Sequence, residues 1–285
     1  MRPTGGPLID LEVQLGRPLT WLSPAWAALC GAVASGRLAL SGQAALTTLL
    51  TLLLADAAWG FLWKLAAERE WPADNCPSRA EVRLAAPPYT VPGSPSQRAF
   101  QRLGEFLAWW RESFWPRHGS ALLVALPLTA ALAAILGRHM VILTSAALAI
   151  VALAFLLRRR GAPPLALQAI LGMGLAWLAG HVAFGPLGWP SLLLAILYTG
   201  TYRACLALAE GKRPLILLNG SQGAVVALLI ALGQPIAAGL VGLSLLPQML
   251  LQPYLRRGGM EAWYLRRTQV FLMAGMMAAA LAIGY

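Results

Sequence analysis

The chain has 285 residues, of which 58% are hydrophobic and 12% are charged, and its formal net charge is +11. Soluble domains carry roughly a quarter charged residues, so this composition and a mean hydropathy of +0.64 exclude a single buried core with an ordinary wet surface. Most of the surface must face lipid. The basic excess then suits anionic lipid headgroups and does not require nucleic acid as a partner.

Apolar runs near the length of about 20 residues needed to cross a bilayer recur along the chain. Because lipid offers no partners to backbone polar groups, each run should be helical. This predicts an all-α polytopic membrane protein with about nine transmembrane helices, in a membrane domain at 20–285 that follows a polar arm at 1–19. The predicted spans are 20–35, 38–65, 120–136, 140–157, 164–182, 190–209, 215–232, 236–251 and 268–284. No small-residue cleavage pattern follows the first run, so it is interpreted as a span and not as a signal peptide.

Positive charge falls mainly on one side of these spans. With alternating spans, 19 of the 22 lysines and arginines lie on the side of the N-terminal arm, and only Arg37 and Arg138 lie on the other, with Arg203 inside the sixth span. The positive-inside rule then places the N-terminus in the cytoplasm and the C-terminus outside, in the cell (inner, cytoplasmic) membrane.

One connection, residues 68–117, is much longer than the others and is expected to be a cytoplasmic insert. It begins with a proline-rich stretch that should be irregular and ends with a predicted amphipathic helix at 96–115. The apolar face of this helix carries Phe100, Leu103, Leu107, Trp110 and Phe114. Such a helix suits anchoring in the membrane interface, and it equally suits docking of a partner subunit or covering of a cavity.

Away from the span ends, two charged residues lie inside predicted spans, Asp56 in the second and Arg203 in the sixth. A carboxylate at the centre of a membrane helix costs roughly 2.5–3.5 kcal/mol on insertion scales, so it normally has a partner or a polar cavity. Counted from Lys64 and Glu210, both residues should lie about 10–12 Å from the cytoplasmic helix ends. We therefore hypothesise that Asp56 and Arg203 pair between the two spans; the alternative is that each finds water or backbone partners separately.

The three cysteines show neither metal-ligand spacing nor a disulfide pattern. Cys30, Cys76 and Cys205 are widely separated and odd in number. They are interpreted as structural thiols, and the spacing of the chain's other potential ligands predicts no metal site either.

Five segments carry a family resemblance. They are RPLTWLSPAWAALCGAVASG at 17–36, GAPP at 161–164, AGHVAFG at 179–185, LLPQ at 245–248 and TQVFLMAG at 268–275. The first is similar to the first span of chlorophyll and bacteriochlorophyll synthases, which are members of the UbiA superfamily of intramembrane prenyltransferases. The others resemble the entry and end of the fifth span and parts of the last two spans of these enzymes. The resemblance covers most of the chain apart from 80–117 and implies a nine-helix bundle with the N-terminus inside.

The resemblance implies an enzyme that joins a chlorophyllide carboxylate to an isoprenoid diphosphate. In the family, two Asp-rich motifs at the cytoplasmic ends of the second and sixth spans hold the Mg²⁺ that neutralises the departing diphosphate. The first motif, Asn-Asp-x-x-Asp-x-x-x-Asp, falls here on residues 66–74. Its leading pair is replaced by Ala66 and Ala67, its middle Asp by Glu70, and only the last Asp is kept, as Asp74.

The second motif, Asn-Asp followed by Glu-Gly-Asp-Arg, is damaged as well. Its leading pair is replaced by Ala204 and Cys205, and its second part reads Glu210, glycine, Lys212 and Arg213. Lysine cannot coordinate Mg²⁺, although it can contact a diphosphate as a point charge. Glu68, Glu70, Asp74 and Glu210 remain as a reduced set of candidate catalytic ligands.

These substitutions favour a non-catalytic relative, a pseudoenzyme. Such a protein would bind bacteriochlorophyll or another tetrapyrrole pigment, a carotenoid, a quinone or an isoprenoid lipid, or it would be a scaffold beside a photosynthetic reaction-centre or antenna complex. The alternative is an active, diverged prenyltransferase that attaches an isoprenoid diphosphate to bacteriochlorophyllide with Mg²⁺. A transporter is a weaker third hypothesis, because intramembrane charge is scarce and no inverted repeat is visible.

Aromatic residues and histidines supply further candidates for ligand binding. Trp59, Trp63, Tyr198 and Tyr202 lie on the second and sixth spans and either line a cavity or pack between helices. His181 and His139 are candidates to ligate a pigment magnesium. A structural role for His181 and an interfacial role for His139 are the favoured alternatives.

Overall fold

The computed structural model describes residues 19, 22–39, 41–67, 94–157, 164–257 and 259–285, and all regular structure in this part of the chain is helical. Seven helical segments are long and apolar enough to cross a membrane by length and composition: Gly42–Ala67, His118–Leu136, Arg138–Phe155, Leu165–Phe184, Trp189–Ala209, Pro235–Leu255 and Glu261–Gly284. Two shorter apolar helices are Pro24–Ala34 and Leu215–Ala231. The chain is therefore a multi-pass, all-α membrane protein, and each predicted span overlaps one of these segments.

Two of the long segments contain a π-helical turn, where one residue more than usual is accommodated, and a third such turn, η2, joins α4 to α5. The second span consists of α2 (Gly42–Leu52), η1 (Leu53–Ala58) and α3 (Trp59–Ala67), and the fifth of α7 (Leu165–Ala169), η4 (Ile170–Leu175) and α8 (Ala176–Phe184). The remaining elements are α1 (Pro24–Ala34), α4 (Pro95–Trp109), η2 (Trp110–Phe114), α5 (Trp115–Leu136), α6 (Arg138–Leu157), α9 (Trp189–Ala209), α10 (Leu215–Ala231), α11 (Pro235–Leu251), the 3₁₀ turn η5 (Gln252–Arg257) and α12 (Glu261–Gly284).

Local sequence signals determine where the helices begin. Ser23 caps α1 by accepting a hydrogen bond from the Trp26 N–H at 3.4 Å, and Pro24 occupies the first helical position. The first span therefore starts at Pro24, not at residue 20. The last span starts at Glu261, seven residues before the predicted start, because Arg266 and Arg267 point outward from a continuous helix.

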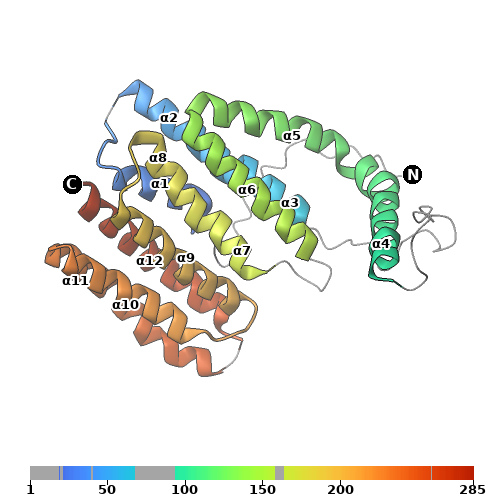
Figure 1. The fold of residues 1–285 in the computed structure, drawn as a ribbon. Helices are drawn as coiled ribbons and strands as arrows, with labels where there is room; N and C mark the ends of the chain where they lie inside the picture. The colour runs from blue at the N-terminus through green and yellow to red at the C-terminus, as the bar shows by residue number, and fades with distance from the viewer. Residues whose placement is uncertain (1–18, 20–21, 40, 68–93, 158–163, 258) are drawn as a thin grey trace, which may run out of the picture.

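Helix α1 is packed between α8 and α12 and also contacts α2 (Figure 1). Glycines permit this close approach. A Cβ atom on Gly31 would overlap the Trp177 carbonyl, one on Gly180 would overlap the Ala28 carbonyl, and one on Gly284 would overlap the Val33 carbonyl. Small residues at helix contacts are typical of membrane proteins, where packing rather than burial from water holds helices together.

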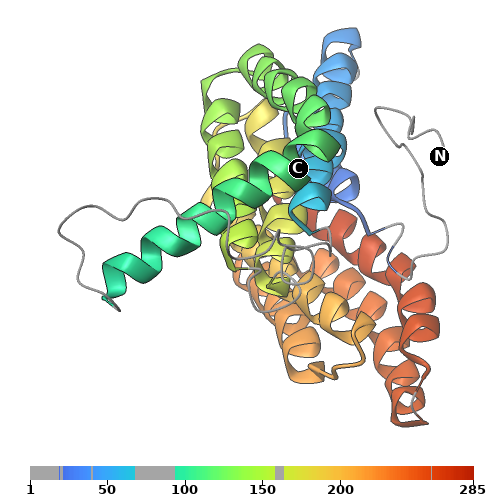
Figure 2. The ribbon, with the colours of Figure 1, turned by 90° about the vertical axis from the view of Figure 1, so that its right-hand side faces the viewer.

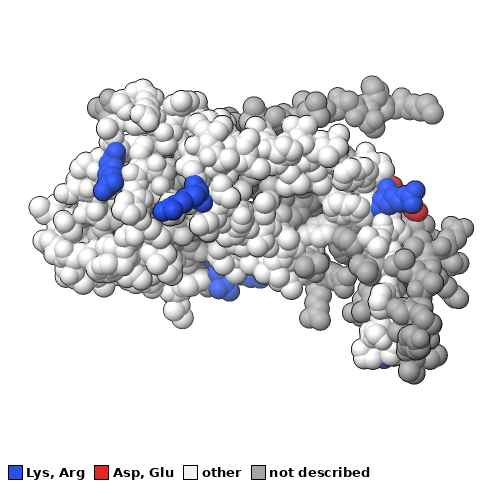
Figure 3. All heavy atoms as spheres, turned by 45° about the horizontal axis from the view of Figure 1, so that its top comes forward, with Lys and Arg blue, Asp and Glu red and all other residues white. Residues whose placement is uncertain are grey.

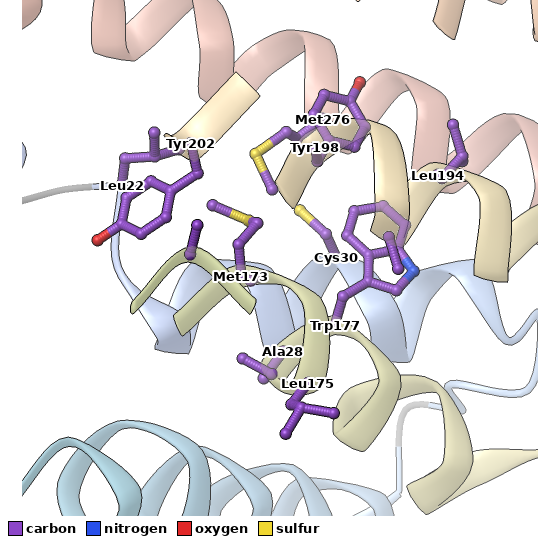
Figure 4. Close-up of a cluster of buried hydrophobic side chains, with 14 of the residues drawn as sticks. Leu22, Ala28, Cys30, Met173, Leu175, Trp177, Leu194, Tyr198, Tyr202 and Met276 are labelled. Carbon is purple, nitrogen blue, oxygen red and sulfur yellow. The ribbon is translucent and has the colours of Figure 1, made fainter. Parts of the chain in front are cut away.

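Aromatic residues fill the space next to α1 (Figure 4). The ring of Trp177 stacks on that of Tyr198 with centroids 5.7 Å apart, and its indole N–H donates to Ser191 Oγ at 2.9 Å. The Tyr198 hydroxyl donates to the Gly275 carbonyl at 3.1 Å. The fifth, sixth and last spans are thereby joined by specific hydrogen bonds as well as by packing.

The outer surface of the bundle is largely apolar. Ile216, Ile236 and Leu250 are 92%, 82% and 74% exposed. On the face shown in Figure 3, only a few charged side chains interrupt an uncharged surface. The exposed apolar side chains form the surface that is expected to face lipid acyl chains.

Helix α4 projects away from the other helices (Figures 1 and 2). Its main packing partner is η2, through which it continues into α5. The amphipathic helix expected at 96–115 coincides with α4 and η2, which begin at Pro95 and end at Phe114.

Candidate functional site

A polar cluster surrounds the start of α1, and we call it the α1-start cluster: Ser23, Ala25, Asp56, Gly172 and Tyr202. Asp56 lies in η1, and its exposed carboxylate is close to the Ala25 backbone N–H. The first backbone N–H groups of a helix have no partner within the helix and carry partial positive charge. Together with the Ser23 cap, Asp56 therefore provides acceptors for the first turn of α1.

The α9 residue in this cluster is Tyr202. Gly172 in η4 lies between it and Pro24, since a Cβ atom at this glycine would be 3.5 Å from Tyr202 Cε1 and 3.7 Å from Pro24 Cγ. Tyr202 is also close enough to Asp56 for the carboxylate charge to act on its hydroxyl. In Figure 4 the Tyr202 hydroxyl lies at the rim of the buried cluster, beside Leu22. Two π-helical turns, η1 and η4, thus border the start of α1.

The predicted ion pair between Asp56 and Arg203 is not formed, since neither side chain makes an ion pair within the described part of the chain. Arg203 is exposed on the outward stripe of α9 that includes Leu192 and Ile196. Tyr202, its neighbour, points inward. The residue count fixed the depth of Arg203 but not its direction, and successive helical residues point about 100° apart.

Two tryptophans that lie close in sequence to members of this cluster have unused donors. The indole N–H groups of Trp26 and Trp59 are buried and have no hydrogen-bond partner among the described residues. Trp26 follows Ala25, and Trp59 lies three residues after Asp56 and is 1% exposed. Leaving a buried donor unpaired is costly, and such groups are often explained by an unseen partner. Trp63 is half-buried against the core, and Tyr198 belongs to the packed core described above.

The loop after α9 brings the charged residues of the second motif together. Gly211, with φ +79°, ends α9 in the left-handed conformation, and the Lys212 N–H donates to the Ala207 carbonyl at 2.9 Å. This turn places the Lys212 ammonium 2.7 Å from Glu210 Oε2. Arg213 lies 3.4 Å from Glu261 Oε1 at the start of α12.

These residues do not fit Mg²⁺. An ammonium already occupies one side of the Glu210 carboxylate, and Mg²⁺ requires oxygen ligands in near-octahedral geometry. No group of three His, Cys, Asp or Glu side chains in the described ranges is arranged to hold a metal ion. Glu68, Glu70 and Asp74 lie outside the described residues.

A row of amide side chains, which the sequence did not single out, joins α10 to α11. Gln222 and Gln248 are buried and exchange two hydrogen bonds of 3.1 and 3.0 Å, and Asn219 and Gln252 exchange two of 3.1 and 2.7 Å. Tyr264 of α12 donates to the Gln248 carbonyl at 3.3 Å. We call this row the amide ladder. Its sequence signal is a pair of amides three residues apart on α10 facing a pair four residues apart, one near the end of α11 and one at the start of η5.

The histidines have separate environments. His181 is 5% exposed, and its Nε2 lies 3.0 Å from the Pro186 carbonyl, which ties the end of α8 to the loop before α9. His181 Nδ1 is buried without a hydrogen-bond partner in the described structure. His139 is exposed at the start of α6, where Arg138 Nε donates to its Nε2 at 3.4 Å.

The aromatic face of the projecting helix is only partly covered. Trp110 stacks on Phe114 at 4.5 Å, and both rings contact Phe155 of α6 edge-on. Phe100 and Leu107 are 37% and 46% exposed. The side chain of Leu103 lies outside the described residues.

The fold and these sites define a multi-pass α-helical membrane protein with a polar cluster inside the bundle. Its sequence is 29% identical, over an alignment of 307 positions, to the bacteriochlorophyll synthase 34 kDa chain of Chloroflexus aurantiacus. The alignment spans 95% of this chain and 89% of that relative. This similarity confirms the resemblance to the chlorophyll-synthase branch of the UbiA superfamily. No family model and no solved structure matches the chain.

Proposed function

We propose that this chain is a chlorophyll-synthase-like membrane protein that binds a tetrapyrrole or isoprenoid molecule without transferring a prenyl group. The observation that carries this proposal is the 2.7 Å pair between Lys212 and Glu210. It occupies the carboxylate that the family motif uses for Mg²⁺, and it adds positive charge at that position. Binding would then be retained while the metal-dependent step is lost.

The α1-start cluster is the proposed binding site. The unused indole donors of Trp26 and Trp59 suit a ligand with carbonyl acceptors, and the Asp56 carboxylate and Tyr202 hydroxyl add polar contacts nearby. A quinone or a bacteriochlorophyll carries such carbonyls. A hydrocarbon carotenoid does not, so it fits these donors less well.

The setting of the protein is part of the same proposal. The uneven distribution of lysine and arginine between the two ends of the spans supports a cytoplasmic N-terminus in the cell membrane. Helix α4, with Phe100 and Leu107 exposed, is proposed to lie in the membrane interface or to dock a subunit of a photosynthetic complex.

Binding is tested by reconstituting the purified protein with a quinone or with bacteriochlorophyll and measuring affinity. Trp59→Phe keeps the ring and removes the indole donor, and it should weaken binding about tenfold, the effect of one lost hydrogen bond of ordinary strength. Trp189→Phe, at a position 61% exposed, is the control and should leave affinity unchanged. Equal affinity for both variants and the wild type would remove the α1-start cluster as the site.

An active, diverged prenyltransferase is the second candidate. The observation that favours it is that the similarity to the bacteriochlorophyll synthase chain extends over 95% of this sequence. The remnant carboxylates Glu68, Glu70, Asp74 and Glu210 would then act as metal ligands.

Incubation with geranylgeranyl diphosphate, bacteriochlorophyllide and Mg²⁺, followed by chromatography of the pigments, separates the two functions. We expect no esterified pigment from the wild type. An esterified product that depends on Mg²⁺, and that Glu70→Gln abolishes, would establish the enzyme instead. A known chlorophyll synthase in the same vesicles serves as the positive control.

A further inference from the structure

Arg203 is a charged residue on an apolar part of the α9 surface. It lies in α9 six residues before Ala209, so its Cα is about 9 Å along the helix from that end. Its side chain is exposed, and within the described structure it has no carboxylate partner. Its companions on the outward stripe, Leu192 and Ile196, are 38% and 56% exposed. A cation on a lipid-facing helix surface is costly unless it reaches an anion or the interface.

Arg203 lies on a strip of the α9 surface between the two helices that pack against α9. On one side, Thr199 packs against Gly174 of η4; on the other, Gly200 packs against Ser221 of α10. Arg203 follows these two residues by four and three positions, so it continues the strip between them one turn closer to the end of α9. The strip is therefore bounded by the fifth and seventh spans and open on its outer side.

The other cations at the end of α9 already have anionic partners. Lys212 is paired with Glu210, and Arg213 is paired with Glu261. An anion attracted to this part of the surface would therefore find in Arg203 a guanidinium that is not engaged by a carboxylate. The flexible arginine side chain can extend along the helix toward the headgroup region while its methylene groups stay in apolar surroundings.

We propose that Arg203 binds the phosphate of an anionic phospholipid, whose acyl chains lie along Leu192 and Ile196 of α9. Guanidinium and phosphate form paired, charge-assisted hydrogen bonds that match in geometry. The phospholipid is the occupant that supplies both an anion at this depth and apolar chains for the neighbouring surface. Arg203 points about 100° around α9 from the buried Tyr202, so this site lies on the outer surface and is separate from the proposed ligand site.

The test is native mass spectrometry of the full-length protein, titrated in detergent with phosphatidylglycerol or phosphatidylcholine. The wild type should retain phosphatidylglycerol preferentially. Arg203→Gln should bind it about tenfold more weakly, the change expected from losing one charge-assisted hydrogen bond, and Arg203→Lys should fall between the two. Because the side chain is exposed, the melting temperatures of both variants should match the wild type.

Arg138→Gln removes one positive charge at another exposed position and should keep the wild-type preference. The proposal is overturned if Arg203→Gln binds phosphatidylglycerol as the wild type does, or if Arg138→Gln loses it equally. Loss of a copurifying polypeptide from Arg203→Gln, with lipid binding unchanged, would also overturn it and assign the strip to a protein partner.

Discussion

Gly180 is a residue whose role is visible only in the packed structure. A Cβ atom there would meet the backbone carbonyl of Ala28, and backbone cannot move aside as a flexible side chain can. The same holds for Gly31 against Trp177. The close contact between α1 and α8 thus explains why Gly180, the first glycine of the AGHVAFG segment, has no side chain. The family resemblance alone does not give this reason.

Gly180→Ala should destabilise the protein by about 1–3 kcal/mol, the usual range for overpacking a close contact. Thermal unfolding in detergent, followed by tryptophan fluorescence, measures this. Gly223→Ala in α10 is the matched control, because nothing lies within 4 Å of its added Cβ, and it should not lower the melting temperature. An unchanged melting temperature for Gly180→Ala would show that α1 and α8 can separate at no cost.

Gln222 and Gln248 satisfy each other inside the amide ladder, so removing one leaves the other unpaired. Gln222→Leu and Gln248→Leu should each cost about 1–2 kcal/mol, in line with interhelical hydrogen bonds in membranes. The double variant should cost less than the sum, because no buried amide remains without a partner. Additive losses in this double-mutant cycle would mean that the two amides act independently.

At the scale of the helix, α1 depends on a carboxylate from another span. Asp56→Ala removes the acceptor for the Ala25 N–H and should lower stability by about 1 kcal/mol, the usual cost of a lost helix cap. Asp56→Asn keeps an acceptor oxygen and should lose less. Hydrogen exchange of residues 25–27 measures the effect, with exchange in α10 as the internal control. Equal exchange in all three proteins would show that the carboxylate does not hold the start of α1.

The elements themselves could be predicted from hydropathy far better than the site. Every apolar run corresponds to a helical segment, because the requirement to satisfy backbone groups in lipid leaves little choice. The start of the last span was missed because Arg266 and Arg267 interrupt the apolar run without interrupting the helix. Hydropathy detects the apolar part of a helix. The helix itself extends as far as its backbone hydrogen bonds continue, which includes polar residues.

The site could be predicted only in part. Tyr202 and Asp56 were chosen from depth and residue type, and the structure brings both to the start of α1. Arg203 was misplaced because depth along a helix does not give the direction around it. The amide ladder was missed because glutamines in separate spans carry no spacing signal until α10 and α11 are known to be adjacent.

For the whole molecule, the distribution of basic residues predicts a fixed orientation that labelling can test. In a Cys76→Ser background, whose other cysteines Cys30 and Cys205 are buried, Lys212→Cys should react with an impermeant maleimide only from the cytoplasmic side. Arg138→Cys, at the opposite end of the bundle, should react only from outside. Labelling of both from one side would contradict the predicted topology.

The position of α1 between α8 and α12 also has a consequence for the order of synthesis. Val33 and Gly36 are made early, whereas Gly284, which lies against both, is made last of the three. At ordinary translation rates these events are separated by on the order of tens of seconds. During that interval the side of α1 that will face α12 is available to lipid, to the insertion machinery or to any other apolar helix. Assembly therefore depends on keeping this side of the first helix unoccupied until the last helix arrives.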